Sequence, residues 1–253
     1  MKSSIGWERC LEFINTQVQP VRERKPGNPA GPRGSVVTIS RQAGSGSHVV
    51  AEELVVRLQA QAADGSFPWT MFDRNLVEKV LEEHDLPDRL AKSMPEDRTS
   101  EMADTMDGLF GLRPSSWALV RKTADTILHL AMLGNVIVIG RAGNIITSRL
   151  DNAFHVRLVG SLDKRIDHVR DNKHLGWKAA SEYVQKQDLG RKRYVNKYYG
   201  KDIDDPLLYH LMINTDRVCY ADAAQMIAEA VFTSSGVRGR EVEAGNRTPP
   251  PAR

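Results

Sequence analysis

The sequence predicts an α/β fold, a three-layer sandwich in which a mostly parallel sheet carries helices on both faces. Short runs rich in β-branched residues alternate with longer segments whose apolar residues recur at helical spacing. Strands that alternate with helices favour parallel pairing, and the helices then cover the two faces of the sheet. Ligands of such sheets bind beyond the carboxyl ends of the strands, so the residues directly after each strand are the first candidates for a site.

Five strands and five helices are expected between residues 36 and 232. The strands are expected at residues 36–40, 68–72, 135–139, 154–159 and 209–213. The helices are expected at about residues 49–61, 76–83, 116–133, 161–172 and 221–232. These elements define one domain, over residues 35–234.

The two ends of the chain differ from this domain. Residues 1–34 form an N-terminal arm: Trp7, Cys10 and Ile14 recur at helical spacing, and a basic linker rich in Pro and Gly follows. We favour a partly ordered arm; a docking helix, or one that forms a homo-oligomer, is the alternative. Residues 235–253 are polar and include three consecutive prolines, so we expect a disordered tail.

The composition is that of an ordinary globular protein. Hydrophobic residues make up 41% and charged residues 26% of the 253 residues, which is usual for soluble domains. A net charge of +3 suits an anionic small molecule, but it is not the strong basic excess of nucleic-acid-binding proteins. No apolar run is long enough for a secretory signal or a membrane span, and two distant cysteines indicate a reducing compartment. We expect a cytoplasmic protein without nucleic-acid or membrane partners. No metal site is expected, because the seven histidines are scattered.

A glycine-rich turn joins the first strand to the next helix and is the first candidate site. It contains the phosphate-binding candidates Arg41, Gly44, Ser45, Gly46, Ser47 and His48. Glycines let backbone N–H groups point inward, and the helix that follows presents its positive end, so the turn can cradle a phosphate. The usual lysine is absent, because Ser47 stands in its place. Arg41 or His48 could replace that charge, and a tight connection without a ligand is the alternative.

Two further candidates follow other strands. Arg141 lies in a Gly140–Gly143 turn after the third strand, where a guanidinium can grip a phosphate with two hydrogen bonds. Asp73 follows the second strand and is a candidate for binding a substrate hydroxyl or base. A surface arginine and a helix cap are the respective alternatives.

The most basic stretch of the chain, residues 186–201, is a candidate lid. Asp188 and Arg191 would share one face of a helix, and Arg193 follows. Arginines on a mobile lid would stabilise the charge that develops during phosphoryl transfer, whereas a solvated charged face is the alternative. Arg165 and Arg170, on the helix after the fourth strand, could face the same cleft, but for both we favour a surface position.

Several of these segments, taken together, resemble the cytidylate kinase-like family. They are Ile39–His48, Phe72-Asp73, Val138–Asn144, Gln187–Tyr194 and Ile213–Asp216, in one order and with fitting gaps over roughly residues 36–232. The resemblance implies the P-loop nucleoside monophosphate kinase fold, with a five-stranded parallel sheet, a phosphate loop, a substrate-binding helical region and a lid.

The resemblance also implies an activity and roles for individual residues. It implies ATP-dependent phosphoryl transfer with Mg²⁺ to a nucleoside monophosphate, most simply CMP or dCMP, so that small-molecule nucleotides are the partners. Arg141, Asp188 and Arg191 would contact the monophosphate or the transferred group, and Arg193 would assist. Ala142 stands where orthodox members of the family have an aspartate. The alternatives are a catalytically weak or inactive nucleotide-binding regulatory protein and a kinase acting on another small phosphate acceptor.

Overall fold

A single five-stranded parallel sheet forms the centre of the fold, in the order β2-β3-β1-β4-β5. The computed structural model describes residues 2–18, 34–62, 68–83, 105–106, 109 and 117–245. The strands are β1 (Val36–Arg41), β2 (Thr70–Phe72), β3 (Val136–Ile139), β4 (Ala153–Val159) and β5 (Leu211–Asn214). The expected sheet of five parallel strands is confirmed, and each expected strand overlaps the observed one. The linker residues 19–33 and residues 246–253 lie outside the described residues.

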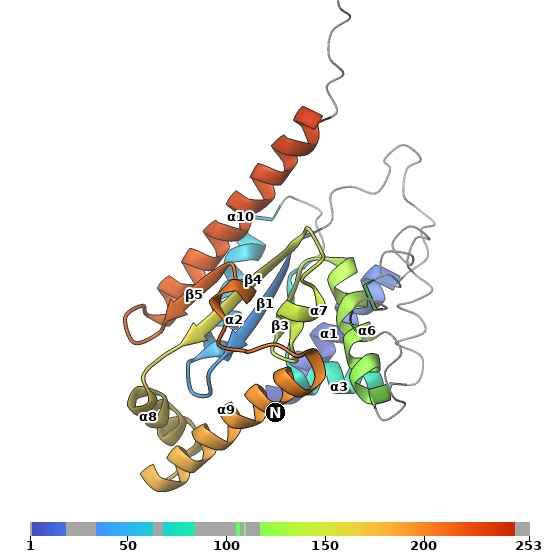
Figure 1. Ribbon diagram of the computed structural model, residues 1–253. Coiled ribbons are helices and arrows are strands. Elements are labelled where there is room, and N and C mark those ends of the chain that lie inside the picture. The colour runs from blue at the N-terminus through green and yellow to red at the C-terminus, as the bar shows by residue number, and fades with distance from the viewer. Residues whose placement is uncertain are drawn as a thin grey trace, which may run out of the picture.

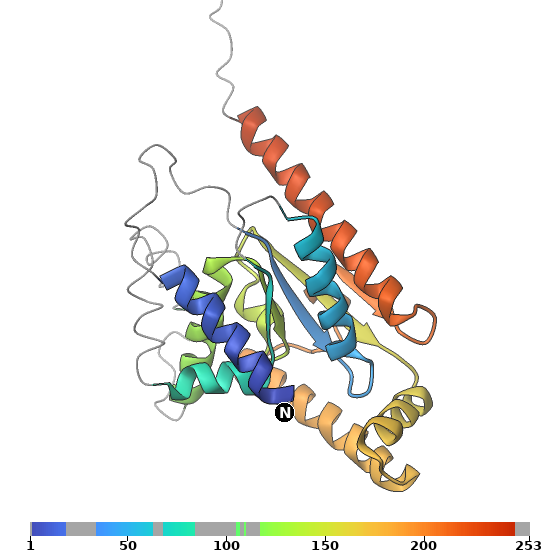
Figure 2. The same cartoon turned by 180° about the vertical axis from the view of Figure 1, so that it is seen from behind.

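Helices connect the strands and cover both faces of the sheet. They are α1 (Lys2–Val18), α2 (Ser47–Ala60), α3 (Arg74–Glu82), α6 (Ala118–Leu133), α7 (Gly143–Ile146), α8 (Leu162–Lys173), α9 (Trp177–Tyr199), the 3-10 helix η2 (Pro206–Leu208) and α10 (Tyr220–Gly245). Figures 1 and 2 show α2 and α10 on one face and α1, α3 and α6 on the other, so the three-layer arrangement is also confirmed.

The alternation of side chains along the strands divides the apolar core in two. Val37 and Ile39 of β1 pack with α2 and α10, whereas Val36 packs with α6 and the elements on the opposite face. Residues two apart on a strand point to the same face, so β1, at the centre of the sheet, contributes to both cores. This packing fixes the carboxyl ends of β1, β3 and β4 beside one another.

The N-terminal helix α1 belongs to this core. Cys10, Phe13 and Ile14 are buried in it, and the ring of Phe13 meets that of Phe72 edge to face at 6.0 Å. The apolar face of α1 is therefore covered by the same chain. An oligomer through this helix stays a prediction.

Two helical regions differ from expectation. Helix α9 is a single helix of 23 residues, whereas the sequence predicts a helix only for its basic part, from residue 186 onward. Helix α10 continues past Phe232 to Gly245, where a disordered tail was expected from residue 235. The first proline after Phe232 is Pro249, so no proline interrupts the helix over that stretch. Within the described ranges no helix has the length and apolar character needed to cross a membrane.

Candidate active site

The glycine-rich turn between β1 and α2 has a conformation that only glycine adopts easily. Gly44 and Gly46 have φ values of 82° and 76°. A Cβ atom at Gly44 would overlap the backbone carbonyl of Arg165, and one at Gly46 would overlap the ring of Tyr220. Ser45 donates a hydrogen bond from its hydroxyl to the carbonyl of Gln42, at 2.9 Å, and closes the turn. The turn therefore requires glycine at both positions and is tightly packed, as expected of a site where the backbone approaches a ligand.

The N-terminus of α2 opens onto a cavity of about 420 Å³ beside this turn. Gly46 precedes the helix, and no side chain among the described residues caps it. The first N–H groups of a helix and its dipole favour an anion at this position. Gly44, Gly46, Ser47 and His48 line the cavity together with Arg41. All the predicted phosphate-binding residues except Ser45 thus face one space.

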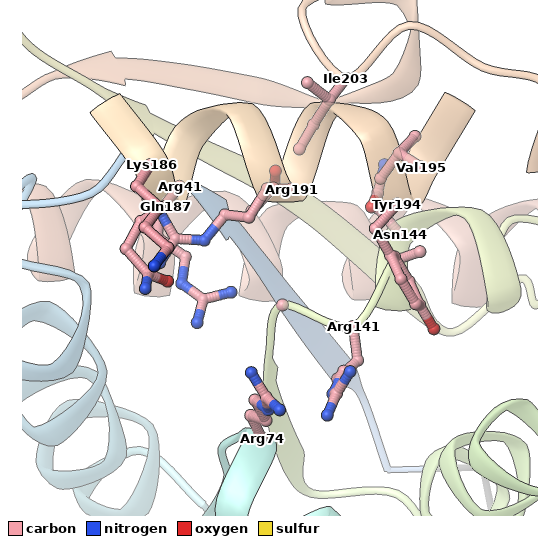
Figure 3. Close-up of a pocket in the computed structure, with 14 residues that line it drawn as sticks. Arg41, Arg74, Arg141, Asn144, Lys186, Gln187, Arg191, Tyr194, Val195 and Ile203 are labelled. Atoms are coloured by element: carbon pink, nitrogen blue, oxygen red, sulfur yellow. The ribbon is translucent and has the colours of Figure 1, made fainter. Parts of the chain in front are cut away.

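A second cavity, of about 370 Å³, lies at the carboxyl edge of the sheet and is rich in cations. Its positive side chains come from the end of β1, the start of α3, the turn after β3 and the helix α9, and they are Arg41, Arg74, Arg141, Lys186 and Arg191. Figure 3 shows Arg41, Arg74 and Arg141 pointing toward one space. We call this space the arginine cavity. Since the carboxyl ends of parallel strands meet at one edge, residues far apart in the sequence converge there.

Arg141 is held in the arginine cavity by a strained turn and by a carboxylate. Arg141 and Ala142 have φ values of 54° and 57°, which are unusual for residues other than glycine. The Arg141 guanidinium donates to a carboxylate oxygen of Glu78, and Nε of Arg74 donates to the same oxygen at 3.2 Å. The Tyr194 ring lies 5.9 Å from the Arg141 guanidinium. One acidic side chain therefore orients two arginines toward the cavity.

Arg41 occupies the junction between the two cavities. It is the last residue of β1, and its guanidinium lies where a Cβ atom of residue 140 would be, while the φ of 80° at Gly140 also favours glycine there. Burial lowers the pKa of Arg41 to about 10, and the nearby charge of Arg191 adds to the effect. Bringing an anion to this position would relieve the repulsion between the cations.

Helix α9 is joined to the glycine-rich turn by Asp188. Its carboxylate accepts hydrogen bonds from the backbone N–H of Ala43 at 2.7 Å, from Arg165 Nη1 at 2.6 Å and from Arg191 Nη1 at 3.2 Å. Asp188 and Arg191 share a face of α9, as expected. Arg191 lines both cavities, and burial lowers its pKa although Asp188 opposes the shift. Asp188 thus places Arg191 at the junction.

The surface position expected for Arg165 is wrong. Its side chain is buried, and its guanidinium donates to the carbonyls of Gly160 and Ala43 as well as to Asp188. The turn supplies a partner 122 residues away in the sequence, which the pattern around Arg165 does not reveal. Arg170, in contrast, is exposed and pairs with Asp167 and Asp171 on the surface, as expected.

Arg193 and Asp73 lie apart from the arginine cavity. Arg193 is exposed, because a helix turns about 100° per residue and this position lies on the face opposite Arg191. Asp73 caps α3 by accepting a hydrogen bond from the N–H of Leu76 at 2.9 Å, and its other oxygen lies 3.3 Å from Nε2 of His48. Burial alone would raise the pKa of Asp73, but the hydrogen bonds from His48 and Leu76 outweigh it and hold that pKa below its usual value.

Three cations near the site were not singled out from the sequence. Arg74 directly follows Asp73, and Lys186 begins the basic stretch, so the rule of inspecting residues after strands would have found Arg74. Arg157 lies inside β4; it donates to the Ser40 hydroxyl at 2.9 Å and to Asp204 at 2.6 Å. Nothing in a strand pattern marks such a buried arginine.

The described residues offer no cluster of three or more His, Cys, Asp or Glu side chains that could hold a metal ion. Mg²⁺ keeps several water ligands and is commonly bound through substrate phosphates with few protein carboxylates. Mg²⁺ bound in that way needs no such cluster of protein ligands.

The sequence profile of the cytidylate kinase-like family matches residues 36–217, which include the glycine-rich turn, Arg141 and Asp188. The chain belongs to the cytidylate kinase-like family. It is 31% identical over 103 residues to a cytidylate kinase of Staphylothermus marinus, covering 40% of this chain and 56% of that protein. It is 29% identical over 98 residues to a cytidylate kinase of Thermoplasma acidophilum, covering 38% and 52%. The chain thus spans only about half the length of these relatives.

The fold is also found in a solved structure. An uncharacterized protein from Eubacterium ventriosum superposes with a TM-score of 0.61 at 21% identity, over 79% of this chain and 99% of the other. This likeness concerns the fold alone.

Proposed function

We propose that the protein transfers the terminal phosphoryl group of ATP, with Mg²⁺, to a nucleoside monophosphate, with CMP and dCMP as the first acceptors to test. One observation carries the proposal: a glycine-rich phosphate cradle and an arginine-lined cavity lie side by side and share Arg41 and Arg191. Phosphoryl transfer needs a donor phosphate and an acceptor phosphate held end to end with cations around the group in flight. Two adjoining cavities that share these arginines would suit that arrangement.

The donor would bind at the glycine-rich turn. Backbone N–H groups of the turn and of the first turn of α2 would receive the triphosphate, and Gly44 and Gly46 allow the phosphates to approach the main chain. His48, bonded to Asp73, lies at the edge of this cavity. Mg²⁺ would arrive with ATP and neutralise charge between the phosphates.

The acceptor would bind in the arginine cavity. Arg141 and Arg74, oriented by Glu78, would hold its phosphate, and Arg191, oriented by Asp188, would contact the transferred group. Asp188 is therefore a positioning residue in this proposal. Positioning and preformed positive charge supply most of the catalysis in such reactions. Arg193, on the exposed face of α9, is left outside the site.

The far wall of the arginine cavity would receive the nucleoside. Ala142, Val195 and Ile203 form an apolar cluster there with Tyr194. Apolar and aromatic side chains suit the face of a base. The side chain of Ala142 cannot hydrogen-bond to an amino group of the base, so the choice among bases must come from other groups.

The test is a coupled assay of the purified protein with ATP and Mg²⁺ across the common nucleoside monophosphates. We expect turnover with at least one of them, and a loss of at least about a hundredfold in kcat/KM in the Arg141→Met, Arg191→Met double variant. An Arg170→Met variant, changed on the surface of α8, serves as the control. If the wild-type protein turns over none of the monophosphates faster than the double variant does, the proposal is refuted.

Ser47 in the lysine position favours a second candidate, a nucleotide-binding regulatory protein with little or no catalysis. It predicts that ATP raises the melting temperature by mass action while no phosphoryl group is transferred. The same preparation and ligands therefore discriminate the two functions.

A further inference from the structure

We infer that Arg41 supplies, from the end of β1, the positive charge at the terminal phosphate of the donor that the glycine-rich turn itself does not supply. This inference rests on the proposed function and assigns one residue within it. Ser47 begins α2 where a lysine would stand, and its buried hydroxyl carries no charge. A cation must then reach the same point from another element.

The position of Arg41 is the first argument. It lines the cavity beside the glycine-rich turn and the arginine cavity, and it also lines a third cavity of about 300 Å³ between the turn and α9. A group passing from a donor in one cavity to an acceptor in the next must cross their junction. Arg41 and Arg191 are the cations that line all three spaces.

The second argument is that the charge of Arg41 is not used within the described part of the protein. The other arginines of the arginine cavity bind carboxylates: Arg74 and Arg141 contact Glu78, and Arg191 contacts Asp188. Within the described ranges no carboxylate lies within ion-pair distance of Arg41, and its charged neighbours are the cations Arg191, Arg141 and Arg74 and the carboxylate of Asp73, which opposes their effect. Asp73 is itself bonded to His48 and to the N–H of Leu76, so an anionic ligand would find in Arg41 a guanidinium without a direct carboxylate partner among those residues.

The remaining basic side chains that line the cavity beside the glycine-rich turn have partners of their own. Lys173 lies over the ring of Tyr183 at 4.9 Å, His48 is bonded to Asp73, and His168 is bonded to the Tyr220 hydroxyl and to Asn172. Among the described residues Arg41 has no such side-chain partner.

The third argument is that the turn after β3 leaves room for the guanidinium at the junction. Gly140, at the end of β3, has a φ of 80°, and its missing Cβ leaves the space in which the Arg41 guanidinium lies. The side chain can therefore extend toward the cavities without a carboxylate within ion-pair distance among the described residues. A positive charge already placed near a group in transfer needs little reorganisation to stabilise it.

The experiment compares binding of ADP and of a non-hydrolysable ATP analogue, both with Mg²⁺, by isothermal titration calorimetry. In the wild-type protein the analogue should bind more tightly than ADP. In Arg41→Met the affinity for the analogue should fall about ten- to hundredfold, while that for ADP changes less than about twofold, because one charge-assisted contact to the terminal phosphate is lost. Arg170→Met, an exposed arginine on α8, should leave both affinities unchanged.

A second variant tests the placement rather than the charge. Gly140→Ala keeps Arg41 but puts a methyl group into the space of its guanidinium, so it should also lose the preference for the analogue over ADP. Melting curves must show that both variants are folded, and if Gly140→Ala is not, Arg41→Lys replaces it and should retain only part of the preference. Equal losses for ADP and the analogue in Arg41→Met, or no loss, would overturn the inference and leave the proposed function standing. If the wild-type protein binds neither nucleotide, the proposed function itself fails.

Discussion

Replacing Asp188 by Asn tests whether one carboxylate joins helix α9 to the glycine-rich turn. Asp188 accepts three hydrogen bonds, from the N–H of Ala43 and from the guanidinium groups of Arg165 and Arg191. The amide of Asn has one oxygen and carries no charge, so it can keep the bond from Ala43 but presents an N–H₂ group or a neutral oxygen to the arginines. The side chain of Arg165, only 8% exposed, would then be left with backbone carbonyls as its partners.

The size of the effect follows from burial. Breaking a fully buried ion pair by removing one partner costs about 3–5 kcal/mol. The side chain of Asp188 is 27% exposed, so water can partly replace it. We therefore expect Asp188→Asn to lower the free energy of unfolding by about 2–3 kcal/mol, or the melting temperature by about 5–10 °C.

Urea unfolding followed by circular dichroism and by tryptophan fluorescence measures this loss, and coincidence of the two curves checks that the transition is two-state. Asp167→Asn is the matched control, because Asp167 pairs with Arg170 on the surface of α8, with side chains 52% and 42% exposed. The control should change stability by less than about 0.5 kcal/mol. If Asp188→Asn is as mild as the control, the carboxylate does not hold α9 to the turn.

Further expectations concern glycines, thiols and acid. Gly44→Ala should lower the free energy of unfolding by more than about 1 kcal/mol, because the new Cβ would meet backbone atoms at a positive φ. Gly190→Ala, in open space within α9, should raise it by about 0.5–1 kcal/mol. Denaturant midpoints measure both changes, and equal effects of the two variants would contradict the packing described for Gly44. Burial raises the pKa of Cys10 to about 12, so at pH 8 a thiol reagent should modify only the exposed Cys219 in the native protein and should react with Cys10 only in urea. Rapid modification of both cysteines in the native protein would be inconsistent with the burial of Cys10. Because the pKa of Asp73 is depressed in the folded state, its contribution to stability is present above about pH 4 and is lost as the pH falls below that value. In Asp73→Asn the free energy of unfolding should therefore fall less steeply with decreasing pH in this range. An unchanged pH dependence would argue against this role of Asp73.

The sequence predicted the elements well where their physical signal is local. Strands β1, β3 and β4 lie within one residue of their expected positions, because apolar runs of four to seven residues are distinctive. The shorter strands β2 and β5 begin two residues later than expected. The rule that parallel strands end at one edge also brought Arg41 and Arg141 to one cavity.

The ion pairs of the site depend on partners distant in the sequence and could not be predicted. Glu78 orients Arg141 from 63 positions away, and Asp188 reaches Ala43 across 145 positions. Arg165 was misplaced for the same reason, since its burial depends on the turn that closes over it. Helix α9 was only partly predicted, because charged residues and Gly190 interrupt its apolar periodicity.

The packing of α1 and α10 has a consequence for where the folding unit ends. The family match covers residues 36–217, yet Phe13 and Ile14 precede it and Ala223 and Ile227 follow it, all of them fully buried. A chain trimmed to the matched segment would keep every candidate phosphate-binding residue but lose α10 from one face of its sheet and α1 from the other. The segment that defines the family is thus smaller than the packed unit, and we expect removal of α1 or of α10 up to Phe232 to lower the stability of the protein.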